Sequence, residues 1–370
     1  MLYRSFYYLV NLGLRFFYRR IYVTGMENIE KDKAYLIACN HPAGFMEPLI
    51  MACMSPIDLY FLVRGDLFEN KLLKPILVGT HQLPIFRFRD GFSSLRQNQQ
   101  TIDKVIDTLA DKKAVMIFAE GSTLDTFGIR PLQKGLGRIT FQALEKYPEL
   151  DLQILPVGIT FSQVGKISSD VMLNVGKPFP ANEFYTPEAK DQPAALTPLL
   201  RKTEEAMREL VISETQEVTR PFIRGHWKSL TIKRNEGFLK RVERGTDFFS
   251  QLQQNISSGQ SPEVMVKETN YISGKRNIWS AMLMPLAAPG YLFMSVPRFV
   301  GLTLQKRLVK KIEFKSPITF ASALFLALIL FLSLLIASLV SFGLIATLIS
   351  VAGLGLSLLA YACIWENFNK

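Results

Sequence analysis

Apolar residues in the first half of the chain gather in short runs, and longer amphipathic stretches separate these runs. The runs have the length and the β-branched or apolar content of buried strands. Alternation of this kind predicts an α/β domain with a largely parallel or mixed sheet covered by helices. Pro156 suggests that its strand lies at an edge of the sheet or begins there. We expect strands at 34–39, 57–63, 114–118 and 153–161, and helices at 98–110 and 135–145.

The C-terminal end has a different pattern, because residues 316–365 contain no Asp, Glu, Lys or Arg. As one helix this stretch would be about 75 Å long, more than twice the roughly 30 Å hydrocarbon core of a bilayer. Ser341-Phe342-Gly343 is the natural break. The sequence therefore predicts two transmembrane spans, near 318–339 and 344–363. The alternative, a helix pair buried in a soluble core, is disfavoured because soluble helices carry a polar face.

A second uncharged segment, 277–297, contains three prolines and a glycine. Proline removes helix hydrogen bonds, so we expect this segment to be kinked, interfacial or re-entrant. Basic residues are in excess on both of its flanks, and the positive-inside rule then places both flanks in the cytoplasm. The two spans that follow return the C-terminus to the same side.

The remaining segments complete the expected organisation. Residues 1–23 mix aromatic side chains with four arginines and no acid, a pattern typical of an interfacial helix, although a helix packed on its own domain would look similar. After position 188 the pattern becomes helical and strongly charged. We therefore expect an interfacial helix (1–24), an α/β domain (25–187), a charged helical arm (188–276), an interfacial or re-entrant segment with a basic flank (277–315) and a two-span hairpin (316–370).

Charge and composition narrow the classes of partner. The chain has 43 Lys+Arg against 32 Asp+Glu, a net charge of +11, which implies nucleic acid, a phospholipid surface or phosphorylated substrates. The basic excess clusters beside the apolar segments and no nucleic-acid recognition motif is present, so a bilayer is favoured over nucleic acid. Three widely spaced cysteines exclude a disulfide framework, and three histidines leave little room for a metal cluster.

One candidate catalytic pair follows the strand at 34–39. His41 lies on the turn after this strand, and Glu47 comes six residues later, just before Pro48. A loop of this length can fold the carboxylate back onto the imidazole, which orients the ring and stabilises its protonated form, as a general base requires. The alternatives are a structural histidine and a glutamate that caps the next helix.

Two further clusters carry charged or polar groups at strand ends. Arg87 and Arg89 are two residues apart, hence on one face of an extended segment, and arginine forks suit phosphate oxygens. The strand at 114–118 leads into a turn at the edge where α/β proteins bind ligands. This turn contains Glu120, Gly121 and Ser122, and Arg130, Lys134 and Arg138 follow it.

In their order and spacing, the blocks NHPAGFMEP, LPIFRFRDG, FAEGST and ILPVGI resemble the lysophospholipid and glycerol-phosphate acyltransferase family. The resemblance covers roughly residues 1–180, and the arm and hairpin also look like a subgroup found in Bacteroidetes-type bacteria and in fungal enzymes. It implies acyl transfer from acyl-CoA or acyl carrier protein to a glycerol-phosphate acceptor, at the cytoplasmic face of the inner membrane. It also implies no metal or cofactor.

The resemblance implies a role for each candidate residue. His41 would be the general base and Glu47 its partner. Arg87 and Arg89 would bind the acceptor phosphate, and Glu120 would position glycerol hydroxyls.

This sequence departs from the family pattern at four places. Ala119 replaces a proline, and Ser122 replaces a threonine but keeps a hydroxyl. The other two departures concern the carboxylate and the phosphate site. Met46 stands where the family usually has Asp, so Glu47, one residue later, is the natural substitute. The Arg that commonly follows the Glu-Gly-Thr block is missing, which leaves phosphate recognition to Arg87, Arg89, Lys134 or Arg138. Two alternatives therefore stay open: acylation of another lipid acceptor, such as an amino-acid lipid, and a non-catalytic membrane scaffold.

Overall fold

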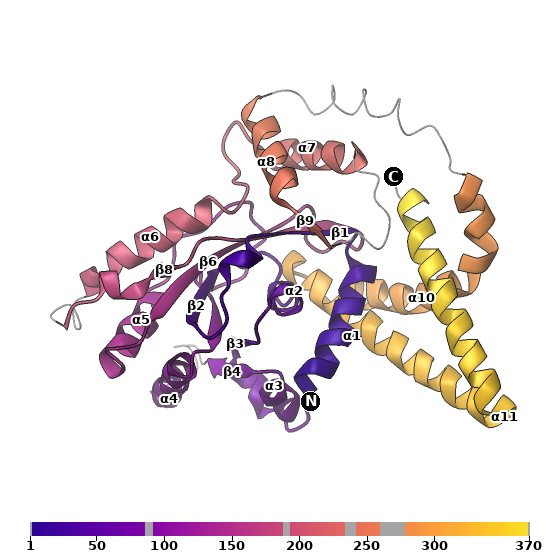
Figure 1. The fold of residues 1–370 in the computed structure, drawn as a ribbon, viewed down its shortest axis with the longest axis horizontal. Coiled ribbons are helices and arrows are strands. Elements are labelled where there is room, and N and C mark those ends of the chain that lie inside the picture. Colours follow the sequence, from indigo (N-terminus) through magenta and orange to yellow (C-terminus); the bar gives the residue numbers. More distant parts are fainter. Residues whose placement is uncertain (1, 86–91, 188–192, 234–241, 260–277, 369–370) are drawn as a thin grey trace.

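The computed structural model describes residues 2–85, 92–187, 193–233, 242–259 and 278–368. A single nine-stranded sheet forms the centre of the described chain, helices cover both of its faces, and long helices lie at one end (Figure 1). The predicted mixed sheet covered by helices is confirmed.

The sheet has the order β4-β3-β5-β2-β6-β7-β1-β9, with β8 beside β6. Neighbouring strands are parallel, except that β6 is antiparallel to β7 and β8. Two of the four expected strands match residue for residue, and the other two match within two residues. The strands are β1 Arg20–Thr24, β2 Ala34–Cys39, β3 Leu59–Arg64, β4 Gln82–Ile85, β5 Ala114–Phe118, β6 Leu152–Phe161, β7 Asp170–Val175, β8 Phe179–Pro180 and β9 Val242–Arg244.

The helices divide between the two faces of the sheet. The first two, α1 and α2, lie on one face together with the start of α11, and α4 to α8 lie on the other. The helices are α1 Leu2–Phe17, α2 Met46–Met54, α3 Lys74–Gly79, α4 Phe92–Ala110, α5 Gly135–Lys146, α6 Thr197–Arg208, α7 Arg220–Lys233, α8 Thr246–Ser257, α10 Ile278–Leu308 and α11 Lys315–Phe368.

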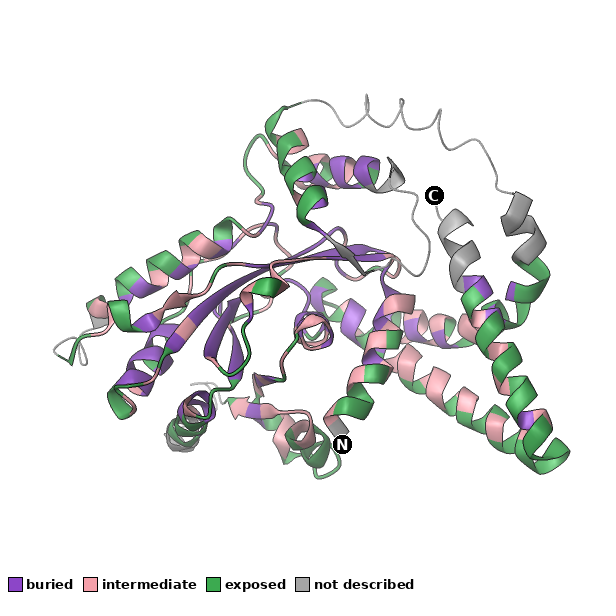
Figure 2. Cartoon of the chain, viewed as in Figure 1, coloured by how far each residue is buried: buried purple, intermediate pink, exposed green. Residues whose placement is uncertain are grey.

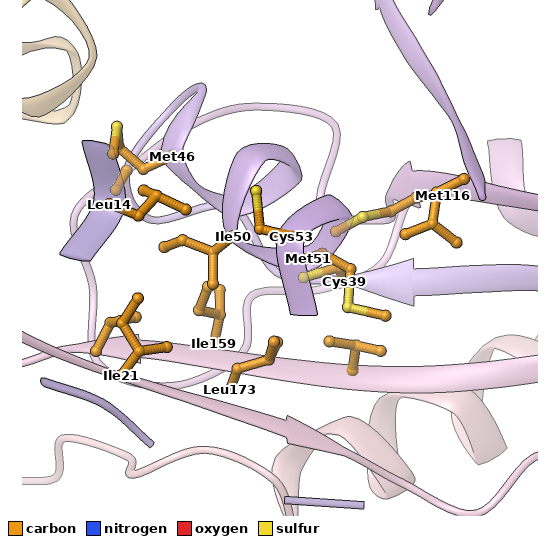
Figure 3. Packing of buried hydrophobic residues seen from close by; sticks show 14 of the residues in the cluster. Leu14, Ile21, Cys39, Met46, Ile50, Met51, Cys53, Met116, Ile159 and Leu173 are labelled. Carbon is orange, nitrogen blue, oxygen red and sulfur yellow. The ribbon is translucent and has the colours of Figure 1, made fainter. Parts of the chain in front are cut away.

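The core follows from the two-residue period of the strands. Tyr35, Ile37 and Cys39 of β2 face α1 and α2, whereas the residues between them face α4 and α5. Figure 3 shows side chains of α1 and α2, among them Leu14 and Ile50, packed over the sheet. Because β2 is buried on both faces, it reads as a continuous apolar run, as expected for a central parallel strand.

The N-terminal helix is shorter than the expected 1–24. It ends at Phe17, and Arg20–Thr24 form strand β1. Ile21 and Tyr22 are buried on opposite faces of the sheet, so this segment cannot lie on a membrane surface.

The arm after position 188 is not wholly helical. Its residues Val242–Arg244 form β9, which pairs in parallel with β1 at the end of the sheet. Helices α7 and α8 pack on the same end, where the ring of Phe248 stacks on Tyr22 with centroids 3.9 Å apart. The arm is therefore part of the sheet domain.

Pro156 lies in a central strand, so its interpretation as an edge or strand start is wrong. β6 pairs with β8 through Gln153 and Ile154, and with β7 from Val157 onward. Pro156 falls between these two partners, where the missing N–H breaks no ladder bond, and its carbonyl accepts the Gly176 N–H at 2.9 Å.

The C-terminal helices contain the expected break. Within α11, Gly343 has φ 78° and ψ −179°, so two helices meet there. Residues Ile312–Tyr361 include a helix long and apolar enough to cross a membrane by length and composition. Large apolar side chains are exposed along it, such as Phe325, Phe342 and Ile349. Figure 2 colours much of this helix as exposed. α10 has Pro285, Pro289 and Pro297 inside one helix, and its membrane placement stays a prediction.

Candidate active site

The site begins where β2 ends. The last β2–β6 pair is Cys39 with Val157, and the Asn40 side chain then continues the ladder. Its Nδ2 donates to the Ile159 carbonyl at 2.9 Å, and its Oδ1 accepts the Ile159 N–H at 2.8 Å. The Asn40 side chain thus makes the two hydrogen bonds to β6 that backbone groups would make in a longer strand, and the chain leaves the sheet at His41. Sequence reasoning missed this role of Asn40, although the Asn precedes the His in the quoted block.

His41 and Glu47 are brought together at this edge. His41 Nδ1 lies 3.4 Å from Glu47 Oε1, and the same oxygen accepts the Ala43 N–H. The Glu47 side chain is fully buried, whereas the His41 side chain is 16% exposed, and its ring stacks on Phe118. Within the described chain, Glu47 Oε2 is buried without a hydrogen-bond partner. The Glu47 carboxylate thus lies next to Nδ1 of His41, and Nε2 is the ring nitrogen that is available to a substrate.

Local structure explains why the carboxylate is at position 47 and not 46. Both residues lie in the first turn of α2, on different sides of the helix. Met46 is fully buried in the apolar cluster beside Leu14 (Figure 3). The family position therefore points into the core of this protein, and the next residue points at His41.

The turn after β5 holds the other half of the site. Glu120 Oε2 accepts the His41 N–H at 3.2 Å and a bond from Arg130 Nη2 at 2.6 Å, while Oε1 accepts the Arg130 N–H at 2.9 Å. Arg130 also donates to the Ser122 hydroxyl at 2.8 Å, and Gly121 has φ 70°. Glu120 thus ties the His41 loop to Arg130. The sequence placed Arg130 only among the basic residues after this turn, because its contact with Glu120 depends on the closing of the loop between them.

The predicted phosphate-binding residues fall in two places. Arg87 and Arg89 lie outside the described residues; β4 ends at Ile85, at the same edge of the sheet as β2 and β5 because these strands run in one direction. Lys134 and Arg138 are exposed at the start of α5. The Gln133 N–H donates to the Ala119 carbonyl at 2.7 Å, which places Lys134 next to the Glu120 turn and Arg138 one helical turn further.

Elements from the second half of the chain also reach the site. The Leu124 N–H donates to the His41 carbonyl, and the neighbouring Asp125 accepts a bond from Arg220 of α7 at 3.1 Å. Burial raises the pKa of Asp125, and the Arg220 guanidinium opposes that shift. On the other side, a Cβ on Gly44 would lie 3.2 Å from the Glu313 carbonyl oxygen, so the C-terminal segment packs on the His41 loop.

Comparison with known proteins gives consistent family assignments. Residues 20–160 match the model of the Acyltransferase family. A 1-acyl-sn-glycerol-3-phosphate acyltransferase of Bacillus subtilis (strain 168) is 25% identical over 184 residues, 49% of this chain and 84% of that protein. Glycerol-3-phosphate O-acyltransferase 2 of Saccharomyces cerevisiae is 27% identical over 135 residues, 36% of this chain but only 17% of the yeast protein.

Among solved structures, the 1-acyl-sn-glycerophosphate (LPA) acyltransferase PlsC from Thermotoga maritima aligns with 53% of this chain and 77% of its own, at a TM-score of 0.40 and 16% identity. The matched region, 20–160, contains His41, Glu47 and the Glu120 turn together with strands β1 to β5 and most of β6. Residues 20–160 therefore carry an Acyltransferase domain, and the similarities support an acyltransferase enzyme of the 1-acylglycerol-3-phosphate type.

Proposed function

We propose that this enzyme moves a fatty acyl group from the thioester of CoA or of acyl carrier protein to a hydroxyl of a glycerol-phosphate acceptor. The acceptor is 1-acylglycerol 3-phosphate or glycerol 3-phosphate, the substrates in the names of its bacterial and yeast relatives. The observation that carries the proposal is the fully buried Glu47 carboxylate behind Nδ1 of the partly exposed His41.

In this mechanism His41 Nε2 takes the proton of the acceptor hydroxyl as its oxygen attacks the thioester carbonyl. Glu47 stabilises the imidazolium that forms. When the C–S bond breaks, the imidazolium returns the proton to the leaving thiolate, so the new ester and the free thiol balance the reaction. The thioester is already activated, and no covalent acyl-enzyme is needed. Glu120 and Arg130 hold the His41 loop in place, because Glu120 Oε2 accepts hydrogen bonds from the His41 N–H and from the Arg130 guanidinium.

An acceptor screen with one labelled acyl thioester tests this function. We expect transfer to glycerol 3-phosphate or 1-acylglycerol 3-phosphate, and His41→Ala should lower kcat by about 10²–10⁴, the usual contribution of a general base. His81→Asn is the matched control, because it removes an imidazole elsewhere and Asn tolerates the positive φ of 60° at that position. Transfer to neutral or amino-acid lipids alone would instead support the alternative acceptor class.

We propose that Arg87 and Arg89 bind the acceptor phosphate, as the resemblance implies. Arg130 is already held by Glu120 and Ser122, and Lys134 and Arg138 are the alternative sites. Loss of a hydrogen bond to a charged group costs about 1.5–3 kcal/mol, so Arg87→Ala or Arg89→Ala should raise the KM for the acceptor roughly ten- to a hundredfold. The KM for the thioester should change little. Arg208→Ala, which removes an exposed pair with Glu204, serves as the control. An unchanged acceptor KM in both variants would move the phosphate site elsewhere.

We further propose that α11 crosses the bilayer twice, with the catalytic domain and Lys370 on the cytoplasmic side. The uncharged stretch, the break at Gly343 and the basic residues between 298 and 315 support this topology. A reporter fused after Lys370 should be active in its cytoplasmic form. Activity restricted to a periplasmic reporter would contradict an even number of crossings.

A further inference from the structure

An apolar cavity of about 370 Å³ lies between α1, α10 and both parts of α11. Leu12 and Phe16 line it from α1, Phe293 and Met294 from α10, and Ala327 and Leu358 from the two parts of α11. Its volume falls within the roughly 300–1,000 Å³ of small-molecule pockets. Both α10 and α11 lie outside residues 20–160, so the cavity is not part of the matched family domain.

Close contacts between the helices explain why a space remains here. The Gly290 N–H of α10 donates to the Ser357 hydroxyl in the second part of α11 at 2.7 Å. Eleven residues later, a Cβ on Gly301 would lie 3.0 Å from the Thr319 carbonyl oxygen in the first part. α10 is thus held against both parts of α11, which diverge from their common turn (Figure 1). The residues of α10 that line the cavity lie between these two contacts, where neither part of α11 fills the space.

The surroundings indicate what would occupy the cavity. α11 exposes large apolar side chains along its length, as expected for a helix in hydrocarbon. Apolar cavities of this kind stay free of water. Arg298 is the one charged residue in the lining that the structure describes, and its guanidinium suits a phosphate. An apolar cavity with one cation in its lining fits a phospholipid better than a neutral lipid.

The cavity is also continuous with the packing around the active site. Phe17 and Phe320 line it, their rings 5.5 Å apart, and both belong to the buried cluster that contains Ala43 and Met46 of the His41 loop. A molecule bound in the cavity would therefore touch two members of the buried cluster that also contains Ala43 and Met46.

We propose that this cavity binds one acyl chain of a membrane phospholipid, with the phosphate toward Arg298. The proposal rests on the proposed placement of α11 in the bilayer, but it does not depend on turnover. A chain bound in this position comes either from a lyso-phospholipid acceptor or from a resident diacyl lipid. Both lipids have an acyl chain attached to a glycerol phosphate headgroup.

Photolabelling of the full-length protein in phosphatidylcholine vesicles tests the proposal. The probe is lysophosphatidate with a diazirine at the end of its chain, used without any acyl donor. We expect crosslinks at Phe293, Met294 and Phe331 in excess over those at the exposed Phe325. Ala327→Trp places an indole ring in the cavity and should lower this labelling roughly tenfold, because the ring takes the space that the lipid chain needs. Ala321→Trp, on the exposed side of the same helix, should label as the wild type.

Competition between the labelled probe and unlabelled lipids in the wild-type protein identifies the lipid that supplies the bound acyl chain. Displacement by unlabelled lysophosphatidate assigns the cavity to the acceptor, and displacement by added diacyl phosphatidate alone assigns it to a resident lipid. Equal labelling of the cavity and of Phe325, or labelling that neither lipid displaces, overturns the proposal. His41→Ala should label normally although it loses turnover, so failure of the cavity and failure of the proposed chemistry are distinguishable.

Discussion

Glu47→Gln should lower kcat by roughly 10²–10⁴ with little effect on KM. The amide oxygen can take the place of Oε1, which accepts the Ala43 N–H and faces His41 Nδ1, so the shape of the contact is kept and its negative charge is lost. The imidazolium that forms when Nε2 takes the proton then lacks its stabilising charge. The corresponding amide substitution in the serine-protease triad costs about 10⁴ in kcat, which gives an upper guide. Charge stabilisation that develops only in the transition state is expressed in kcat.

Two further variants separate this role from a helix cap. Glu47→Asp shortens the reach and should give intermediate activity. Met46→Asp combined with Glu47→Ala should not restore activity, because the new carboxylate would lie in the apolar cluster beside Leu14. A plain cap would cost about 1 kcal/mol of stability and little turnover. Near-normal kcat together with a lowered melting temperature in Glu47→Gln would therefore remove Glu47 from the mechanism.

Arg19→Ala should destabilise the fold by about 3–5 kcal/mol, the usual cost of leaving a buried charge without its partner. Arg19 Nε and Nη2 bind the fully buried Asp170 at 2.9 and 2.5 Å, and the Trp227 indole N–H donates to the same carboxylate at 3.1 Å. This carboxylate thus joins the start of β1, the start of β7 and α7. Thermal unfolding in detergent, followed by circular dichroism, measures the effect.

A surface ion pair provides the comparison for this variant. Arg208→Ala removes the exposed pair with Glu204 one helical turn away, which should cost at most about 0.5 kcal/mol. Arg19→Lys keeps a positive charge but loses the two-pronged contact, so it should lie between the two. A melting temperature of Arg19→Ala equal to that of Arg208→Ala would show that Asp170 is stabilised by other groups.

The two strands that the sequence predicted residue for residue, β2 and β5, are short apolar runs buried over almost their whole length. Both are apolar on the two faces, and polar residues follow them closely: Asn40 comes directly after β2, and Glu120 comes two residues after the end of β5. Five strands were not predicted, namely β1, β4, β7, β8 and β9. β1 and β9 lack such an apolar run. Arg20–Thr24 continues the basic and aromatic pattern of α1, and Val242–Arg244 is a three-residue strand within a charged region. Their pairing depends on contacts between segments more than 200 residues apart, which no local pattern records.

In the site, too, contacts between residues close in the sequence could be predicted, whereas contacts between distant segments could not. His41 and Glu47 are six residues apart, so spacing alone could suggest their proximity. The Arg220 contact to Asp125 joins segments 95 residues apart, and the packing of Glu313 on Gly44 joins segments even more distant. These contacts depend on the complete fold, and charge patterns alone did not predict them.

The addition of β9 beside β1 makes the family-matched region an incomplete folding unit. A fragment that ends near residue 187 would lack β9 and would expose the backbone N–H and C=O groups on the outer side of β1. It would also uncover Tyr22, which Phe248 and Trp227 now bury. An open strand edge next to an apolar patch is a template for intermolecular pairing. Such a fragment should therefore aggregate even where its catalytic residues are intact, and soluble versions of this enzyme should retain the chain at least through α8.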